Sequence, residues 1–340
     1  MGGRRGRGNR NRGIGVEDVN KAVLVTGAAG FIGSHLSERL LSMGHRVVGL
    51  DNFDDCYPPA IKRENIQSMQ HSEGFRLVEG DVRDALLLDR VLSENDIGTV
   101  VHLAACAGVR PSLEQPLIYQ DVNIKGTLAL LEASRAYGVE QFIFASSSSV
   151  YGLNGKAPFN EEAKVSYPVS PYAASKAAAE LFCRTYSHLY GLPVTVLRLF
   201  TVYGPRQRPE MAIHRFAKMV NRGEKVILFD QGTAKRDYTY IDDIVAGFEA
   251  ALTHQKNGYH IFNLGRGKTV DLRYLITLIE EALGKKAQIE TAEQQPGEVH
   301  ITLADISKAQ TLLGYQPMVS IEEGIPRFIR WYLEKREVRG

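Results

Sequence analysis

The amino-acid sequence predicts an α/β protein with a doubly wound parallel sheet and a smaller C-terminal lobe. Short runs rich in β-branched residues alternate with longer amphipathic segments as far as Tyr203, and this alternation is typical of βαβ units. The short runs are almost continuously apolar, as expected of strands that helices cover on both faces. The chain has 340 residues, enough for two domains or for one large and one small lobe.

The expected elements follow in a regular order along the chain. The first strand, 21–26, leads through a glycine-rich turn into a helix over 34–43, which Gly44 ends. The later strands are expected at 46–51, 75–79, 99–104, 141–146 and 195–200, and the later helices at 86–93, 116–137 and 172–189.

The pattern changes after Tyr203, where a segment rich in glycine, proline and arginine interrupts it and shorter elements follow. We therefore predict a disordered leader at 1–20, a main domain at 21–203 and a smaller lobe at 204–335. A segment near 240–265 is expected to return to the main domain, because the run 259–264 could add a strand to its sheet.

The net charge of +2 combines two unlike parts. Five arginines, at positions 4, 5, 7, 10 and 12, lie in the Gly/Asn-rich leader, so the rest of the chain carries −3. A mildly acidic body argues against a nucleic-acid-binding domain. We expect the leader to be a disordered tail or an overlong start, with an RNA- or phosphate-binding arm as the alternative.

The composition also excludes several other classes of protein. No apolar run approaches the ~20 residues of a membrane span, and the leader lacks the apolar core of a secretory signal. Cys56, Cys106 and Cys183 are widely spaced and fit neither a metal site nor a disulfide framework. We therefore expect a protein without a metal in a reducing compartment, the cytoplasm.

A phosphate-binding turn is expected between the first strand and the first helix. Gly27, Gly30 and Gly33 let the backbone approach a pyrophosphate, and the helix N-terminus offers free N–H groups. Phe31 and Ile32 belong to the same turn. The strand before, the helix after and an acid 18 residues beyond Gly33 together indicate a Rossmann-like dinucleotide-binding domain.

That acid, Asp51, ends the second expected strand and is followed by Asn52. A carboxylate here can accept both ribose hydroxyls and would repel a 2′-phosphate, so the sequence favours NAD over NADP. Other residues at strand ends either contact the cofactor or simply pack there: Asp81, Val82, Leu103, Ala104 and Ala105.

A Tyr-x-x-x-Lys pair indicates a proton shuttle. On a helix, Tyr172 and Lys176 share one face, and an ammonium beside the nicotinamide charge is expected to lower the pKa of the phenol. Tyr172 would then transfer protons near neutral pH. Ser147 lies in the segment 146–152 after a strand, where serine hydroxyls can bond and orient a substrate oxygen.

Taken together, these motifs resemble those of the extended short-chain dehydrogenase/reductases, and specifically of nucleotide-sugar 4-epimerases. The similarity runs from about Val23 to Trp331. It implies that Tyr172 is the base, Lys176 its partner and Ser147 the catalytic hydroxyl. It also implies that Ser148 and Ser149 lie near the sugar, that a buried Asn123 fixes a helix near the site, and that NAD stays bound.

The resemblance implies a specific reaction cycle. Tyr172 takes the proton of the sugar 4-OH while the C4 hydride passes to NAD, and the 4-keto sugar turns over before the hydride returns to its other face. Related dehydratases and uronate decarboxylases carry an acid before the Val-Tyr-Gly motif, where this chain has Ser149. Simple epimerisation is therefore expected.

The smaller lobe is expected to bind the nucleotide of the substrate. By resemblance, Arg236 meets the pyrophosphate, which suits a bidentate guanidinium, and Phe229 lies beside the uracil, although it may equally belong to the core. Glu298 falls in the loop that meets the ribose, where family members usually have Asp, and Gln295 stands where many have Arg.

The segment 199–212 is similar to that of UDP-glucuronate 4-epimerases. We expect Thr201 and Arg208 to hold the carboxylate of a 4-keto uronate out of the alignment that releases CO2. Arg110 either faces the sugar or lies on the surface. A UDP-glucose/UDP-galactose or UDP-N-acetylhexosamine 4-epimerase is the alternative, and a non-catalytic NAD-sensing or RNA-binding protein a more distant one.

The resemblance also implies a homodimer that pairs two helices from each subunit, with 116–137 and 172–189 as the candidates. Their apolar residues could serve packing within one subunit equally well. The expected partner is a UDP-sugar substrate, with no nucleic acid and no membrane.

Overall fold

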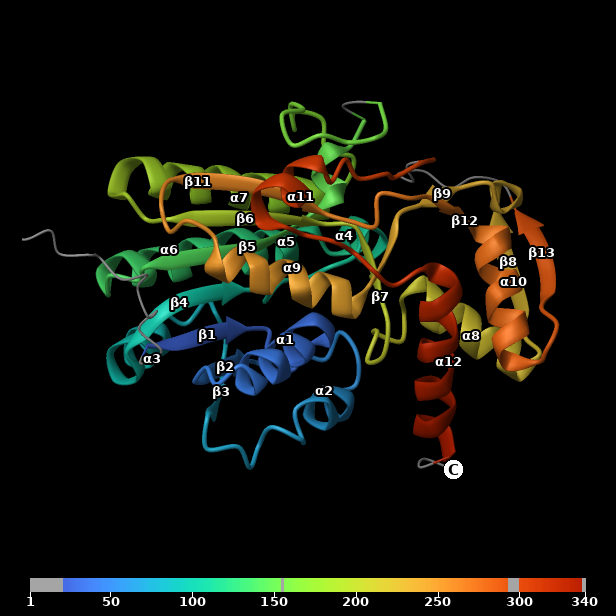
Figure 1. Cartoon of the computed structure of the whole chain (residues 1–340), viewed down its shortest axis with the longest axis horizontal. Coiled ribbons are helices and arrows are strands. Elements are labelled where there is room, and N and C mark those ends of the chain that lie inside the picture. The colour runs from blue at the N-terminus through green and yellow to red at the C-terminus, as the bar shows by residue number, and fades with distance from the viewer. Residues whose placement is uncertain (1–20, 154–155, 293–299, 338–340) are drawn as a thin grey trace, which may run out of the picture.

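The computed structural model describes residues 21–153, 156–292 and 300–337. Its centre is a seven-stranded parallel sheet in the order β11-β6-β5-β4-β1-β2-β3 (Figure 1). The strands are β1 (Ala22–Thr26), β2 (Val47–Asp51), β3 (Phe75–Glu79), β4 (Ile97–His102), β5 (Gln141–Ser147), β6 (Val194–Leu199) and β11 (Tyr259–Leu264). This sheet confirms the predicted fold class.

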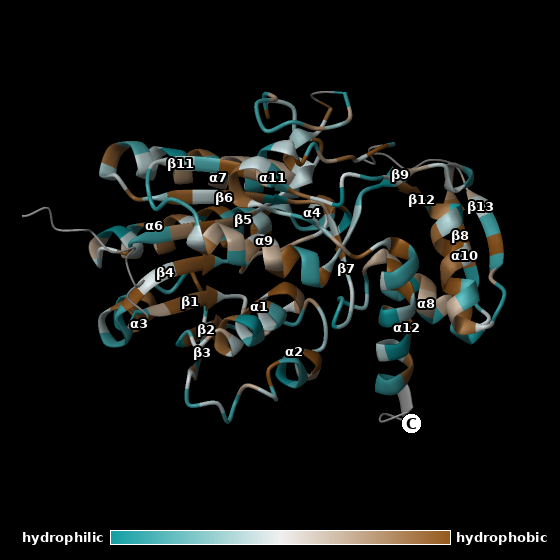
Figure 2. Ribbon diagram, viewed as in Figure 1, coloured by the Kyte–Doolittle hydropathy of each residue, from teal (hydrophilic) through white to brown (hydrophobic). Residues whose placement is uncertain are grey.

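Helices cover both faces of the sheet (Figure 1). Alternate side chains of each strand point to opposite faces, so Val23 and Val25 join one core and Leu24 joins the other. The first core includes α1 (Phe31–Ser42) and α9 (Ile241–Thr253). The second includes α3 (Ala85–Asn95), α6 (Gly126–Ala136) and α7 (Pro171–Tyr190). Figure 2 shows the strands between these layers as predominantly hydrophobic.

The strand order reverses between β1 and β4, which are hydrogen-bonded neighbours. At such a point the connections leave toward opposite faces and open a crevice beyond the carboxyl ends of the strands. Thr26 and His102 end these two strands side by side. The architecture therefore places a ligand crevice at the glycine turn that follows β1.

The smaller lobe lies beyond the carboxyl edge of the sheet (Figure 1). It contains the parallel pair β8 (Lys225–Phe229) and β13 (Gln288–Ala292), with α8 (Ala212–Arg222), α10 (Leu272–Leu283) and α12 (Ile321–Glu337). Two short pairs connect it to the main unit: β7 (Thr201–Tyr203) with β10 (Tyr238–Tyr240), and β9 (Lys235–Arg236) with β12 (Val270–Asp271).

Several elements differ from the sequence expectation. The expected helix 116–137 consists of α5 (Pro116–Tyr119), the π-helical turn η1 (Gln120–Lys125) and α6. The strand expected at 99–104 is β4, which ends at His102. Sequence reasoning named neither α2 (Pro59–Asn65) nor α4 (Val109–Glu114). In the C-terminal segment, α11 (Ser307–Leu313) packs against β11 of the main sheet.

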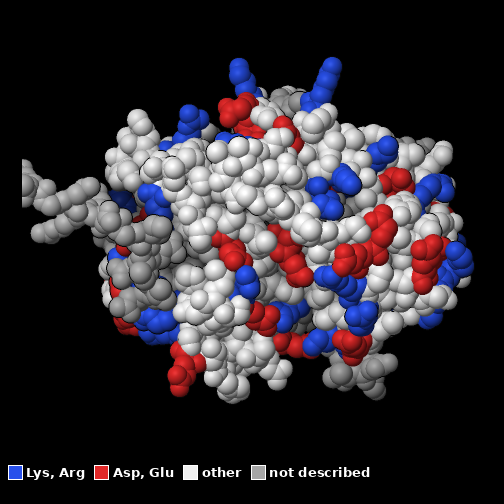
Figure 3. Space-filling model, viewed as in Figure 1, with Lys and Arg blue, Asp and Glu red and all other residues white. Residues whose placement is uncertain are grey.

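The surface carries charges of both signs. On the face shown in Figure 3, acidic and basic side chains are interspersed rather than gathered into one basic patch. Arg327, for example, pairs with Asp242 and Glu323. Within the ranges given above, no helix is long and apolar enough to cross a membrane, and no group of His, Cys, Asp and Glu side chains is arranged to hold a metal ion.

Candidate functional site

The turn after β1 has no room for side chains at two of its glycines. Gly27 has a φ of +70°, and a Cβ atom there would lie 2.9 Å from the backbone nitrogen of Ala104. A Cβ atom at Gly33 would lie 2.1 Å from the carbonyl oxygen of Gly27. Gly30 is the N-cap of α1 and makes no side-chain capping bond, while Phe31 is buried and Ile32 partly buried in the first turn. The turn thus presents bare backbone, as a pyrophosphate requires.

Asp51 ties the end of β2 to this turn. Its carboxylate accepts hydrogen bonds from the backbone N–H of Ala29 at 3.0 Å and of Phe53 at 2.9 Å. Burial raises the pKa of Asp51 because a buried carboxylate loses its hydration. With the bare glycine turn beside it, this carboxylate fits the ribose end of a dinucleotide.

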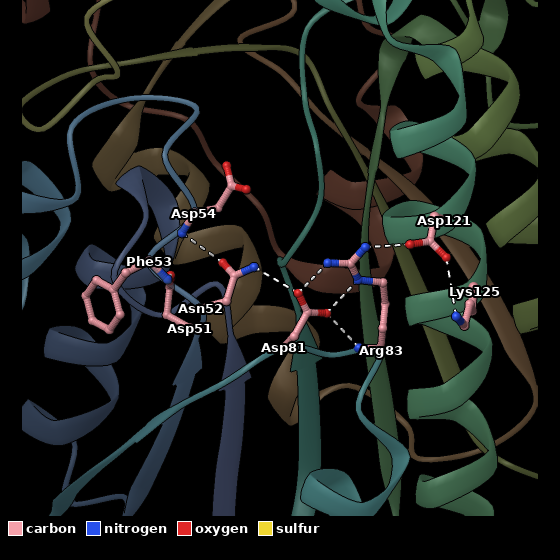
Figure 4. Close-up of polar contacts among 8 residues, drawn as sticks. All are labelled: Asp51, Asn52, Phe53, Asp54, Asp81, Arg83, Asp121 and Lys125. Carbon is pink, nitrogen blue, oxygen red and sulfur yellow. Dashed lines mark hydrogen bonds and ion pairs between the residues drawn. The ribbon is translucent and has the colours of Figure 1, made fainter.

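A series of hydrogen bonds and ion pairs runs from Asn52 through Asp81, Arg83 and Asp121 to Lys125 (Figure 4). Asn52 Nδ2 donates to Asp81 Oδ2 at 3.0 Å, and the guanidinium of Arg83 binds both oxygens of Asp81 at 2.7–2.8 Å. Arg83 Nη1 also binds Asp121 at 2.5 Å, and Asp121 pairs with Lys125 at 3.4 Å. Because of Arg83, the pKa of Asp81 falls to about 2. Sequence reasoning missed Arg83, although it is only two residues from Asp81.

The adjacent Val82 points into the protein. It is buried, and a Cβ atom at Gly126 would lie 2.8 Å from Val82 Cγ2. Its position favours packing over cofactor contact.

The segment Leu103, Ala104 and Ala105 follows β4 directly beside the glycine turn. The backbone N–H of Leu103 donates to the carbonyl of Thr26 at 3.2 Å, and that of Ala104 donates to Thr26 Oγ1 at 3.2 Å. The backbone of Leu103 and Ala104 thus lies against the turn at Gly27.

His102 forms a buried chain that sequence reasoning did not anticipate. Its two ring nitrogens lie 2.8 Å from Thr26 Oγ1 and 2.9 Å from Thr127 Oγ1. Thr127 Oγ1 in turn donates to the carbonyl of Asn123 at 2.6 Å. Burial and the charge of Lys176 lower the pKa of His102 to about 3, so the imidazole is neutral at pH 7. The chain joins β1, β4 and α6 beneath the site.

Asn123 lies in the π-helical turn η1 and is almost fully buried. Its Oδ1 accepts from the backbone N–H of Cys106 at 2.8 Å, and its Nδ2 donates to the carbonyl of Cys106 and to Ser175 Oγ, both at 2.9 Å. Ser175 Oγ donates to the carbonyl of Tyr172 at 2.8 Å. Asn123 therefore joins the loop after β4 to the first turn of α7.

Tyr172 and Lys176 lie one turn apart on α7, which begins at an N-cap bond from the Ala173 N–H to Ser170 Oγ at 3.1 Å. Burial raises the pKa of Tyr172, against a hydrogen bond with Ser147 and the charge of Arg208, which lower it. The effect of Lys176 beside a bound nicotinamide on the pKa of Tyr172 stays a prediction. Lys176 Nζ donates to the carbonyl of Ala145 at 2.8 Å, and burial lowers its pKa to about 8.

The serine segment turns sharply after β5. Ser147 is the last residue of the strand, and Ser148 and Ser149 begin the 3₁₀ turn η2 (Ser148–Tyr151). Ser147 Oγ accepts from the backbone N–H of Ser149 at 3.2 Å and donates to Ser149 Oγ at 3.1 Å. The turn thereby holds the Ser147 hydroxyl next to the phenol of Tyr172.

Arg208 lies in the segment after β7, and its charge reaches the phenol of Tyr172. Its charge lowers the pKa of Tyr172, and it does the same at Tyr119 and Tyr57 against the effect of their burial. The ring of Tyr119 meets that of Tyr172 edge to face at 6.1 Å. Tyr119 and Tyr57 were not among the expected site residues. Arg208 Nε also lies 3.2 Å from Glu210 Oε1.

The remaining expected substrate residues lie on the lobe and on its connections. The half-buried Thr201 lies on β7, and its N–H donates to the carbonyl of Asp237 at 3.0 Å. The guanidinium of Arg110, on α4, lies 5.2 Å from the ring centre of Phe229, on β8. Glu298 lies outside the described residues.

Arg236, on β9, directs its guanidinium at backbone carbonyls. Nη1 donates to the carbonyls of Lys235 at 3.0 Å and His300 at 3.2 Å. These contacts hold the Arg236 side chain against the backbone of Lys235 and His300.

Comparison with known proteins gives one consistent family. The family described as GDP-mannose 4,6 dehydratase matches residues 24–328. The UDP-glucuronate 4-epimerase of Thermodesulfobacterium geofontis is 45% identical over 316 residues, covering 93% of this chain and 97% of that protein. UDP-glucuronate 4-epimerase 3 of Arabidopsis thaliana is 43% identical, covering 92% of this chain and 76% of that protein.

Two solved structures are similar over nearly their whole length. The UDP-glucuronic acid 4-epimerase of Bacillus cereus, in complex with UDP-glucuronic acid and NAD, has a TM-score of 0.88 and 39% identity, covering 92% of this chain and 99% of that one. The UDP-glucose 4-epimerase of Thermotoga maritima, with UDP-glucose, has a TM-score of 0.84 and 34% identity, covering 93% and 99%. The chain thus belongs to the NAD-dependent epimerase/dehydratase family of extended short-chain dehydrogenase/reductases.

Proposed function

We propose that the protein is an NAD-dependent UDP-glucuronate 4-epimerase, which converts UDP-glucuronate to UDP-galacturonate through a 4-keto sugar. Its relatives in Thermodesulfobacterium and Arabidopsis carry that activity in their names. The observation that carries the substrate assignment is the position of Arg208, whose charge acts on the catalytic phenol of Tyr172. A cation whose charge acts on the base suits a sugar with a carboxylate next to the reacting carbon.

The cofactor assignment rests on the crevice beyond β1. The bare backbone at Gly27 and Gly33 would receive the pyrophosphate, and Asp51 the ribose. When bound, NAD supplies reversible hydride acceptance at the sugar C4.

Tyr172 is the base that removes the proton of the sugar 4-OH. The hydrogen bond with Ser147 and the charge of Arg208 both favour its phenolate, and each opposes the effect of burial. The ammonium of Lys176 is buried one helical turn away on the same face of α7. Ser147 is placed to orient the oxygen from which Tyr172 removes the proton.

The carboxylate of the keto intermediate must be held to prevent loss of CO2. Decarboxylation requires the C–CO2 bond to lie perpendicular to the carbonyl plane. A guanidinium that binds both carboxylate oxygens fixes the plane of that group, and Arg208 with Thr201 is suited to this role. The position before Val150 holds Ser149 rather than an acid, which leaves no carboxylate there for elimination.

Nucleotide binding is assigned to the region between the two units. Arg110 and Phe229 come from α4 and β8 and meet in a cation–π contact. This contact supports the assignment, because an aromatic ring and cations together suit a base and a pyrophosphate. Arg236 is assigned to the pyrophosphate from the lobe side.

The test is incubation of the purified protein with a panel of UDP-sugars, without added NAD, and chromatography of the products. Conversion of UDP-glucuronate to UDP-galacturonate, without UDP-pentose, is the expected result. Release of UDP-pentose contradicts the proposal. Turnover confined to UDP-glucose and UDP-galactose would instead favour the activity named for the Thermotoga relative.

We further infer a homodimer built on α5 and α7. Leu117, Leu181 and Leu189 are more than half exposed on these helices, at 80%, 64% and 61%. Such a stripe of large apolar residues suits burial against a second copy. Light scattering of Leu181→Glu should report a monomer where the unaltered chain reports a dimer; a monomer for both contradicts the inference.

A further inference from the structure

Two opposite charges are buried behind the catalytic residues. Glu180, on α7, and Arg198, on β6, have side chains only 4% and 3% exposed. Arg198 Nη2 lies 2.7 Å from Glu180 Oε2 and Arg198 Nε lies 3.0 Å from Oε1. This is a bidentate contact, which fixes the relative orientation of the two elements as well as their separation.

Glu180 connects directly to the residues that carry the chemistry. It follows Lys176 by four residues and Tyr172 by eight, so all three share one face of α7. Its Oε1 also accepts a hydrogen bond from Ser146 Oγ at 2.5 Å. Ser146 immediately precedes Ser147 on β5, so one carboxylate holds both the helix of the base and the strand of the catalytic hydroxyl.

Arg198 extends the same connection to the serine turn η2 and to the edge strand β11. Its guanidinium lies 4.9 Å from the ring centre of Tyr151, in the turn η2, and Nη1 donates to the carbonyl of Glu161 at 3.4 Å. The hydroxyl of Tyr151 donates to Asn263 Oδ1, on β11, at 2.6 Å. The contact thus reaches the serine turn η2 directly and β11 through Tyr151.

Stability alone gives little reason for such a pair. Removing two charges from water is costly, and well-packed apolar residues of similar volume are often as stabilising or more so. We propose that Glu180 and Arg198 are positioning residues that set the distance between the Ser147 hydroxyl and the Tyr172–Lys176 face of α7. The proposal rests on the proposed epimerase reaction, in which these three groups act together.

The pair also has an electrostatic effect on Lys176. Burial lowers the pKa of Lys176, while the charge of Glu180 and the thiols of Cys183 and Cys106 raise it. The other groups that face Lys176 are the Phe144 ring at 4.8 Å, the carbonyl of Ala145 and the neutral imidazole of His102. Without the Glu180 charge the pKa of Lys176 would therefore fall, and Lys176 would lose its proton at a lower pH.

The decisive variant is Glu180→Gln, which keeps the shape of the side chain and removes its charge. We expect kcat to fall about 10–100-fold, KM for UDP-glucuronate to change less than about threefold, and bound NAD to be retained. The alkaline limb of the pH–rate profile should move to lower pH. A purely structural role would reduce the folded fraction or the melting temperature and leave that limb unmoved.

Glu180→Gln leaves Arg198 buried without its partner, which can prevent folding. The double variant Glu180→Gln/Arg198→Met removes both charges and should fold, yet show the same loss of kcat. The single variant Arg198→Lys should also lose activity, because a single ammonium cannot make the bidentate contact.

Glu140→Gln is the matched control: Glu140 immediately precedes β5, at the end opposite Ser147, and pairs with the exposed Lys21 at 2.7 Å. It should leave kcat and the pH profile unchanged.

Wild-type kcat in the folded double variant, with an unmoved alkaline limb, would overturn the proposal. That outcome is distinct from a failure of the proposed function, which appears in the unaltered enzyme as a different product or substrate. In that case the variants would be assayed on the UDP-sugar that the enzyme does convert. The ratio of each variant's kcat to that of the unaltered enzyme would then test the positioning role of Glu180 and Arg198.

Discussion

Lys176 is a residue that the fold tolerates at a cost in stability. Its side chain is buried, and its pKa in the native state is about 8 instead of 10.5. Below pH 8 the lysine is charged in both states, and the full cost of burying that charge falls on the native state. The cost disappears as the pH rises toward 10.5, because the unfolded state then loses the proton as well. A charge retained at such cost indicates function rather than stability.

We predict that Lys176→Met raises the free energy of unfolding at pH 7 by about 1–3 kcal/mol and abolishes epimerisation. The gain comes from replacing a buried ammonium by an apolar side chain of similar length. Urea denaturation monitored by circular dichroism measures it. Lys225→Met, at a side chain 70% exposed on β8, is the control and should change stability by less than about 0.5 kcal/mol. A less stable Lys176→Met would contradict this account of Lys176.

We propose that the choice of sugar depends on Arg208. Its charge lowers the pKa of the phenols of Tyr172, Tyr119 and Tyr57 against the effect of their burial. Glu210 at 3.2 Å leaves part of the guanidinium available to a second carboxylate.

For Arg208→Ala we predict a loss of about 10–100-fold in kcat/KM on UDP-glucuronate, the usual range for a lost charge-assisted hydrogen bond. The loss on UDP-glucose, which has no carboxylate, should be several-fold smaller. Steady-state kinetics on the two substrates gives both values. An equal loss on both would remove Arg208 from carboxylate recognition.

At the scale of elements, the π-helical turn η1 is connected to the start of α7 through Asn123. A π-turn shifts the register of hydrogen bonds within a helix, and such turns are frequent at functional sites. Here the turn carries Asn123, which binds the backbone of Cys106 and the hydroxyl of Ser175. The loop after β4 and the start of α7 are therefore held by one side chain.

Asn123→Ala should lower the free energy of unfolding by about 2–4 kcal/mol, because it leaves buried backbone groups of Cys106 without partners. It should also reduce kcat, since Ser175 and Tyr172 share a turn of α7. Chemical denaturation and steady-state kinetics measure the two effects. Unchanged stability together with unchanged kcat would show that η1 does not position the site.

The strength of the sequence prediction differed between elements for physical reasons. The bounds of α7 were visible because Ser170 and Pro171 start a helix and Gly191 ends it. The π-turn was not visible, since its residues fit the same apolar periodicity as an uninterrupted helix from 116 to 137. The end of β4 was placed two residues late because small apolar residues continue past His102.

At the scale of the whole molecule, two units meet over one site. The sheet supplies the glycine turn, Asp51, Ser147 and the α7 pair, while the segment after β7 supplies Arg208. The local motifs were readable from the sequence because each spans only a few residues. The contacts of His102, of Arg83 with Asp121 and of the Glu180–Arg198 pair were not, because their partners lie between 18 and 76 residues apart and come together only in the folded chain.

The stability of the molecule should depend on pH through His102. Its native pKa of about 3 lies below the ordinary 6.5, so the unfolded state binds the proton more readily between these values. Native stability is therefore complete above pH 6.5 and declines as the pH falls. From pH 6.5 to 5 we predict a loss of about 2 kcal/mol from this residue. The free energy of unfolding as a function of pH should fall less steeply in His102→Gln, and an identical slope would contradict the assignment.

The central claim is reversible oxidation at C4 of a UDP-uronate without loss of its carboxylate. The most direct measurement is a nuclear magnetic resonance time course of the enzyme as purified, with UDP-glucuronate deuterated at C4. We predict UDP-galacturonate that retains the deuterium at C4, with no release of CO2. Release of CO2, or a product that has exchanged the deuterium with solvent, would contradict it.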